Sequence, residues 1–479
     1  MGLKAKALSG FLWSSAGTLG NGLMSFLVTI ILARILSPED FAIVALLTVF
    51  VTVSNVLVDS GFSQAIIRDD NPSSTDLSSV FYFNLGLSLI LYAVLFVLSP
   101  YIAEFYNEPR LVELSRVVFL IIIFNAFIII QNATLKRSLE FSKVEKSSVL
   151  GSFIAGVISI IMAFSNCGIW AIVANMVLMP LFRAVLLWIY SNWKPILKFS
   201  FRSIRKYLKF GVFLMLNNMV DMIITNLNTL VIGKFYTKKE LGYYSQACKL
   251  GTYIVTPLTS VINKVVYPVF AKIKDDDTKL VEGYNKILGL LIFITFPIMM
   301  FVVFNSKTTT IFFFGEKWES SSIFLQYLSI LDMFQIIQYI FMNIVIVKGR
   351  TGSLLIVTII RQFLRVVTLL FTVRISVEAV VLGFVISSIA GTIMYIGLGM
   401  YYLKYKVLNI FTDNYKTIVS TAVSIFLAVA LGSFIEWPIF YKFIFQGVVM
   451  VILYILLNIL FKNTYLKEIV SLVSSFKKK

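Results

Sequence analysis

The chain has 479 residues, of which 58% are hydrophobic and 14% charged, and a formal net charge of +18. A water-soluble protein of this length would have too little polar material to cover its surface, so the composition indicates an integral membrane protein. The chain has no histidine and only two cysteines, which leaves no disulfide framework and no paired metal-ligand spacing.

Apolar runs of the length that crosses a bilayer as a helix, about 20 residues, recur along the whole chain. They are too long and unbroken for the alternating strands of a β-barrel. We therefore expect an all-α integral membrane protein with fourteen transmembrane helices. The predicted spans are 12–35, 41–61, 79–100, 114–134, 147–166, 168–190, 210–233, 241–263, 286–305, 323–347, 354–373, 378–402, 417–435 and 438–461.

Two short stretches 200 residues apart, ARILSPEDFA and GKFYTKKELG, share one pattern of basic, apolar, hydroxyl, acidic and small residues. In each, a hydroxyl residue is followed three positions later by an acid, which predicts a helix N-terminus with a capping box. The predicted pairs are Ser37 with Asp40 and Thr237 with Glu240. Both stretches are therefore expected to be turns that lead into a helix.

These turns follow the first and seventh spans, so each belongs to a block of six helices. Because six is even, both blocks enter the membrane from the same side, as parallel repeats do. We expect a lobe of helices 1–6 in residues 1–190, a basic cytoplasmic linker in 191–209, a lobe of helices 7–12 in 210–402, and two further helices with a basic tail in 403–479. The linker suits an amphipathic helix on the membrane surface or a solvated connector.

Lysine and arginine are concentrated in the N-terminus, the even-numbered loops and the C-terminus, and most densely in 135–146 and 191–209. The positive-inside rule then places both termini in the cytoplasm. Under this interpretation the positive charge belongs to loops that face an anionic leaflet, and it requires no nucleic-acid partner.

Five motifs occur in order along the chain: LARILSPEDFA (32–42), DSGFSQAIIR (59–68), LKRSLEF (135–141), YPVFAKIKDD (267–276) and FFGEKW (313–318). Together with the expected layout of six, six and two helices, these motifs resemble those of the polysaccharide transporter family. That family is part of the multidrug, oligosaccharidyl-lipid and polysaccharide exporter superfamily. The likeness is strongest to its O-antigen and colanic-acid type flippases.

That resemblance implies a multi-pass protein of the bacterial cytoplasmic membrane, with no cofactor. It implies that an undecaprenyl-diphosphate-linked oligosaccharide moves from the inner to the outer leaflet by alternating access, for surface polysaccharide biosynthesis. The lipid-linked oligosaccharide and membrane lipids are then the partners. A polysaccharide polymerase as a further partner, and H⁺ or Na⁺ as coupling ion, are left open.

A diphosphate that crosses hydrocarbon needs fixed cations, and charged side chains inside membrane spans usually face a cavity or a partner. The predicted phosphate-binding residues are Arg361, Arg365, Lys249 and Arg183. Arg361 and Arg365 lead, because they are four apart on one helix face and a guanidinium can hold phosphate oxygens bidentately. Lys249 and Arg183 could instead extend their charge to the membrane surface.

Polar side chains also form rows on otherwise apolar helices. The candidates for a polar cavity or for ion coupling are Asn21, Asn217, Asp221, Asn228, Asp332 and Gln335. Such rows can bind sugar hydroxyls, couple a proton or sodium ion, or hold helices together. Asp221 and Asp332 are also the alternative ion-pair partners of the arginine pair. Asp59 is expected to cap or pair at the end of its helix.

An enzyme, such as a polytopic polysaccharide polymerase or ligase, is the alternative from another class. The scattered acids, the lack of histidine and the short outward loops argue against it. No nucleotide-binding phosphate loop is present. An ion-coupled drug exporter and a lipid II flippase of the same superfamily are closer alternatives, although a drug exporter should favour acidic residues in its cavity.

Overall fold

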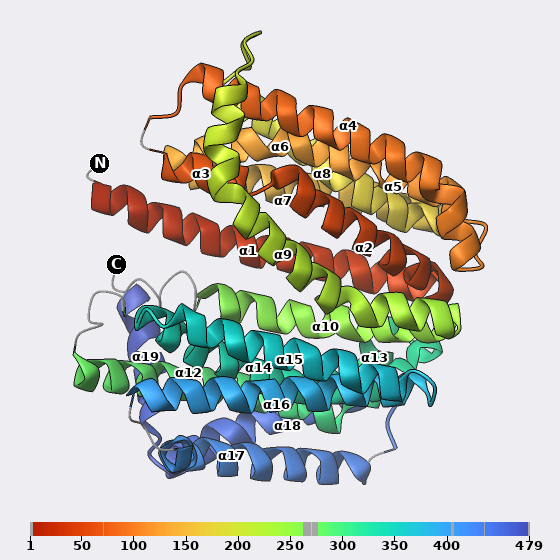
Figure 1. Ribbon diagram of the computed structural model, residues 1–479. Helices are drawn as coiled ribbons and strands as arrows, with labels where there is room; N and C mark the ends of the chain where they lie inside the picture. Colours follow the sequence, from red (N-terminus) through yellow and green to blue (C-terminus); the bar gives the residue numbers. More distant parts are fainter. Residues whose placement is uncertain are drawn as a thin grey trace. The chain divides into compact units, whose positions relative to one another are not determined.

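The computed structural model describes residues 3–69, 71–261, 270, 276–403, 407–434 and 436–477, and all of its regular elements in these ranges are helices (Figure 1). The chain forms two compact units, Met1–Ser245 and Gln246–Lys479. The predicted lobe and linker boundaries stay predictions. The motif YPVFAKIKDD lies almost wholly outside the described residues.

The described residues of the first unit form nine helices and the start of a tenth. α1 packs on α7 and α7 on α8, while α9 packs on α2, α3 and α4. The helices are α1 (Leu3–Ile35), α2 (Pro38–Asp59), α3 (Phe62–Arg68), α4 (Ser74–Phe105), α5 (Leu111–Val118), α6 (Leu120–Arg137), α7 (Phe141–Phe164), α8 (Trp170–Tyr190), α9 (Phe201–Phe235) and α10 (Lys238–Val261).

In the second unit α14 packs on α12 and α16, and α15 packs on α16. The helices are α12 (Asp277–Phe304), α13 (Ser306–Phe314), α14 (Ser321–Val347), α15 (Thr351–Thr372), α16 (Val377–Leu403), α17 (Val407–Ser433), α18 (Ile439–Leu460) and α19 (Thr464–Lys477), with a short 3₁₀ turn at Glu316–Trp318.

Each predicted span overlaps a helix, but within the described residues twelve helical segments are long and apolar enough to cross a membrane. α9 and α10 overlap the predicted seventh and eighth spans and are not among these twelve. A multi-pass membrane protein is thus confirmed, whereas the count of fourteen crossing helices stays a prediction. The predicted fourth span is divided at Phe119 into α5 and α6.

Both predicted capping boxes are present. Ser37 Oγ accepts the backbone N–H of Asp40 at 3.3 Å, and the Asp40 carboxylate accepts the Ser37 N–H at 3.2 Å. Thr237 and Glu240 make the same two bonds at 3.3 and 3.0 Å. The repeated sequence pattern therefore builds the same local structure twice.

Close backbone contacts hold α9 and the start of α10 against α2. A Cβ atom on Gly242 would lie 2.0 Å from the carbonyl oxygen of Pro38, beside the two repeated turns. At the opposite end of α2, a Cβ on Gly211 would lie 2.1 Å from the carbonyl oxygen of Ser60. Glycine is required at both contacts, because any side chain would separate the helices.

The segment between α8 and α9 is only partly helical. Residues 191–200 form no helix, and α9 begins at Phe201. The backbone N–H of Ile196 donates to Ser78 Oγ at 3.0 Å and that of Ser200 to Ser79 Oγ at 2.9 Å. An amphipathic helix over the whole predicted linker is therefore wrong for its first half, whose backbone bonds to α4 instead.

Candidate functional site

Arg361 and Arg365 lie one turn apart on α15, on the side that faces α16. The stem of Arg361 covers Gly391, where a Cβ would lie 2.4 Å from its Cγ and Cδ atoms. Its guanidinium carbon lies 5.5 Å from the ring centroid of Tyr395, and that of Arg365 lies 3.9 Å from the ring centroid of Phe384. Both cations thus stack on aromatic faces of α16, which orients them without neutralising them.

The hydrogen-bond capacity of Arg361 is incompletely used. Its Nε is buried and has no hydrogen-bond partner within the described residues. In the described part of the second unit, neither Arg361 nor Asp332 takes part in a salt bridge. A buried N–H without an acceptor costs about 1–3 kcal/mol of folding free energy, a cost that an acceptor atom placed beside it would remove.

Asp332 on α14 lies against the backbone of α10. A Cβ on Gly251 would lie 2.4 Å from its Oδ2, so a larger residue there would displace the carboxylate. Lys249 is two residues before Gly251 and is partly buried. Gln335, one turn further along α14, is also partly buried and makes no hydrogen bond to another described residue.

Asn21 joins α1 to α7. Its Nδ2 donates to Ser148 Oγ at 2.8 Å, and Ser152 Oγ donates to its Oδ1 at 2.8 Å. Both ends of the amide are therefore used for helix packing. On α8, Arg183 is partly buried near Glu145 of α7, and its Nε has no hydrogen-bond partner among the described residues.

The predicted polar residues of α9 do not share one environment. Asp221 is exposed, whereas Asn228 is 2% exposed and its Nδ2 has no hydrogen-bond partner in the described ranges. The side chain of Asn217 lies outside the described part of the structure. The polar residues that the sequence places in one row on this helix therefore do not form a single continuous binding surface.

A polar pocket of about 270 Å³ lies between α2 and α9, within the first unit. Its lining combines a carboxylate, two amides and a hydroxyl with small or apolar groups. The lining residues are Thr52, Asn55, Val56, Asp59, Gly61, Met215 and Asn218. Sequence reasoning missed Asn55 and Asn218, although Asn55 precedes Asp59 by one helical turn and shares its face.

Two of these polar side chains are held in place from outside the pocket. Asp59 Oδ1 accepts both the backbone N–H and the hydroxyl of Ser63, at 3.3 and 2.5 Å, so this carboxylate bonds to the first turn of α3. Asn125 Nδ2 donates to Asn55 Oδ1 at 3.0 Å. Among the described residues, Asp59 Oδ2, Asn55 Nδ2 and the amide of Asn218 make no hydrogen bond.

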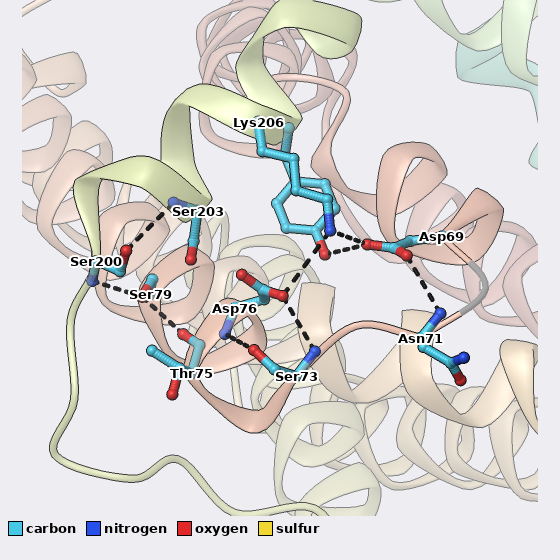
Figure 2. A network of polar contacts seen from close by, with 10 residues as sticks. Asp69, Asn71, Ser73, Thr75, Asp76, Ser79, Ser200, Ser203 and Lys206 are labelled. Atoms are coloured by element: carbon cyan, nitrogen blue, oxygen red, sulfur yellow. Dashed lines mark hydrogen bonds and ion pairs between the residues drawn. The ribbon is translucent and has the colours of Figure 1, made fainter.

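A second polar cluster, shown in Figure 2, joins the start of α9 to the C-terminal end of α3 and the start of α4. Asp69 accepts from Lys206 Nζ at 2.5 Å and from the Tyr207 hydroxyl at 2.7 Å. These two bonds lower the pKa of Asp69 to about 2. Lys206 also lies 3.9 Å from Asp76, whose partner Ser73 caps α4. All these charges are paired, so the cluster is a clamp between segments.

Comparison with known proteins decides the family. A family model described as "Polysaccharide biosynthesis protein" matches residues 31–323, a stretch that contains all five motifs. The chain belongs to this family.

Relatives of this family member are known from several bacteria. The lipopolysaccharide biosynthesis protein WzxC of Escherichia coli is 28% identical, over 90% of this chain and 89% of its own. The teichuronic acid biosynthesis protein TuaB of Bacillus subtilis is 24% identical, over 72% and 71%. The succinoglycan biosynthesis transport protein ExoT of Rhizobium meliloti is 24% identical, over 64% and 62%.

Solved structures show the fold of this family member. The lipid II flippase MurJ, in an inward closed conformation, matches with a TM-score of 0.74, at 17% identity, over 94% of this chain and 98% of its own. An inward-facing multidrug resistance MATE transporter matches with a TM-score of 0.64, at 16% identity, over 80% and 94%. These likenesses show the fold, which this chain shares with MurJ and MATE transporters; the family expected from the motifs is confirmed by the family match.

Proposed function

We propose that this protein is a flippase that moves undecaprenyl-diphosphate-linked oligosaccharide units from the inner to the outer leaflet of the bacterial cytoplasmic membrane. The observation that carries the proposal is the match to the polysaccharide biosynthesis family over residues 31–323, in a chain with the fold of MurJ. The relatives act in the biosynthesis of lipopolysaccharide, teichuronic acid and succinoglycan, and ExoT is named as a transport protein.

The drug-exporter alternative is weaker. MATE transporters share the fold. The three MATE structures compared are 14–16% identical to this chain, and a likeness at that level carries no information about the substrate. The side chains with unused hydrogen-bond capacity in the second unit include a guanidinium, which suits an anionic substrate better than a cationic drug.

Arg361 and Arg365 are assigned to the diphosphate. Their guanidinium groups are oriented by aromatic rings of α16, and the buried Nε of Arg361 has no acceptor within the described residues. Phosphate oxygens would satisfy that donor and add charge-assisted bonds. Lys249 and Arg183 are secondary phosphate contacts.

Asp332 is assigned to ion coupling. It is a partly buried carboxylate without an ion-pair partner among the described residues, beside the segment that carries Lys249. A carboxylate in such surroundings can exchange between a proton, a sodium ion and a neighbouring ammonium group. Gln335, Asn228, Asn217 and Asp221 are secondary polar contacts, and Asn21 serves helix packing.

Deletion of the gene tests the proposed function. The surface polysaccharide should be lost, and undecaprenyl-linked repeat units should accumulate on the cytoplasmic side of the membrane. Complementation with the wild-type gene should reverse both effects. Unchanged surface glycans, together with a new sensitivity to cationic drugs, would instead support the exporter.

A further inference from the structure

The polar pocket between α2 and α9 is distinct from the arginine pair in chemistry and in position along the chain. Its polar lining is Thr52, Asn55, Asp59 and Asn218, and no basic residue is among the lining residues that the structure describes. A diphosphate would be repelled by the carboxylate and would find no cation there. The ligand of this pocket is therefore uncharged or cationic.

The hydrogen-bonding pattern favours an uncharged ligand with several hydroxyl groups. Asp59 and Asn55 are each fixed through Oδ1, to Ser63 and Asn125, which leaves Asp59 Oδ2 as an acceptor and Asn55 Nδ2 as a donor. Asn218 adds an amide that offers both. A side chain with one polar atom already hydrogen-bonded and the other still open is held in position for a ligand. The two open atoms suit a ligand that donates one hydrogen bond and accepts another from neighbouring groups.

The volume is in agreement with one sugar ring. Sites for drug-sized ligands occupy about 300–1,000 Å³, so a pocket of about 270 Å³ suits a single pyranose. A bare cation would leave most of that space to water, and the two amides contribute donors that a cation cannot use.

We propose that the α2–α9 pocket, lined by Thr52, Asn55, Asp59 and Asn218, binds one uncharged sugar residue of the carried glycan through its hydroxyl groups. This assignment rests on the proposed function, since it names the part of the substrate that the first unit binds. It further implies that a uronic acid is disfavoured at this subsite, because its carboxylate would face Asp59.

Competition binding to the purified full chain tests the assignment. Labelled undecaprenyl diphosphate is the tracer. The competitors are unlabelled undecaprenyl diphosphate and the lipid-linked oligosaccharide pool extracted from bacteria that carry the gene. The wild type should prefer the extracted pool by about tenfold or more, which corresponds to about 1.4 kcal/mol.

Asn218→Leu and Asp59→Leu should each reduce this preference below about threefold, while the affinity for undecaprenyl diphosphate stays the same. Asn226→Leu is the matched control, because Asn226 is on the same helix and donates to the carbonyl of Met222 in its own helix. It should keep the wild-type preference. Arg361→Ala should weaken the binding of both competitors equally.

Each of the other results overturns the assignment in a recognisable way. If both leucine variants keep the preference, the pocket does not bind sugar, although the flippase proposal survives. A change in sodium dependence without a change in preference would identify a cation site instead. If the wild type binds neither undecaprenyl diphosphate nor the pool, the proposed function fails and the sugar subsite fails with it.

Discussion

Two sets of polar side chains, one in each compact unit, carry the two binding proposals. In the second unit, Arg361 and Arg365 present guanidinium groups along α16. In the first unit, amides, a hydroxyl and one carboxylate line the pocket between α2 and α9. We propose that the arginine pair contacts the diphosphate and that the pocket binds a neutral sugar.

Replacement of both arginines tests the phosphate contact. Arg361→Ala with Arg365→Ala should reduce export of surface glycan at least tenfold at unchanged membrane levels, because the diphosphate loses its guanidinium contacts. The corresponding lysine pair should recover only part of the export, since an ammonium cannot bind bidentately. Glycan export by a deletion strain complemented with each variant is the measurement.

Arg374→Ala is the control for that experiment, because Arg374 is exposed in the turn between α15 and α16. It should export like the wild type. Normal export by the alanine pair would show that the two arginines are structural.

The Asp69–Lys206 clamp gives a prediction for stability as a function of pH. The pKa of Asp69 is lowered to about 2 in the folded protein. Its contribution to the free energy of unfolding is therefore fully present above the unfolded-state pKa near 4 and is lost as the pH falls through about 2. In detergent, Asp69→Asn should lower the melting temperature by the same few degrees at pH 8 and pH 5. The effect is small because the Lys206 side chain is 50% exposed.

Lys206→Met should remove most of the same stabilisation. The melting temperature of the double variant should be only slightly below that of either single variant. Additive effects of the two substitutions would contradict the clamp.

Sequence patterns identified the arginine pair but missed the pocket, and the reason is physical. Arg361 and Arg365 share a face through helical periodicity alone, so spacing places them together. Asn218 meets Asn55 and Asp59 only because α9 packs on α2. Sequence spacing contains no information about such a tertiary contact, although the Asn55–Asp59 spacing gave a partial signal.

At the scale of elements, hydropathy located helices well because a membrane span is defined by length and apolar composition. The capping boxes at Ser37 and Thr237 fixed where two helices begin. Hydropathy missed the short α3 and α13 and the division of the fourth span at Phe119. These features depend on local turns inside apolar sequence, where composition does not change.

The close contact of α2 and α9 predicts that Gly211 cannot be enlarged. Gly211→Val should destabilise the protein by about 1–3 kcal/mol, because the side chain would overlap the carbonyl oxygen of Ser60. Thermal unfolding in detergent measures the effect. Gly86→Ala is the control, since a Cβ on Gly86 meets nothing within 4 Å, and it should leave stability unchanged or slightly raised.

Equal stability of the two variants would show that the backbones of α2 and α9 do not need this contact.

The predicted orientation places the turn between α7 and α8 outside the cell. Cys167 in that turn is exposed, so a membrane-impermeant maleimide should label it in right-side-out vesicles of a Cys248→Ser variant. Ser138→Cys, with Cys167 also replaced by serine, is the control on the opposite side. Ser138 is exposed after α6, and the cysteine there should react only after permeabilisation. The reverse pattern would place both termini outside.

At the scale of the whole molecule, the family and the transporter fold were predictable because composition, repeat and motifs all pointed the same way. The repeated sequence predicts lobes at 1–190 and 210–402 joined by a linker at 191–209, and these boundaries stay predictions. The two compact units of the structure divide after Ser245. The packing of α9 on α2, α3 and α4 explains why the first unit extends beyond the first six predicted spans.

The central claim is that the protein moves a lipid-linked oligosaccharide across the membrane, and reconstitution tests it most directly. The wild-type chain is placed in liposomes whose inner leaflet contains the extracted lipid-linked oligosaccharide pool, and a membrane-impermeant glycosidase is added outside. We predict that glycan cleavage rises with time only in liposomes that contain the protein, and that the Arg361→Ala, Arg365→Ala variant removes most of this rise. Cleavage equal to that of protein-free liposomes, in vesicles where correct insertion has been verified, would contradict the account.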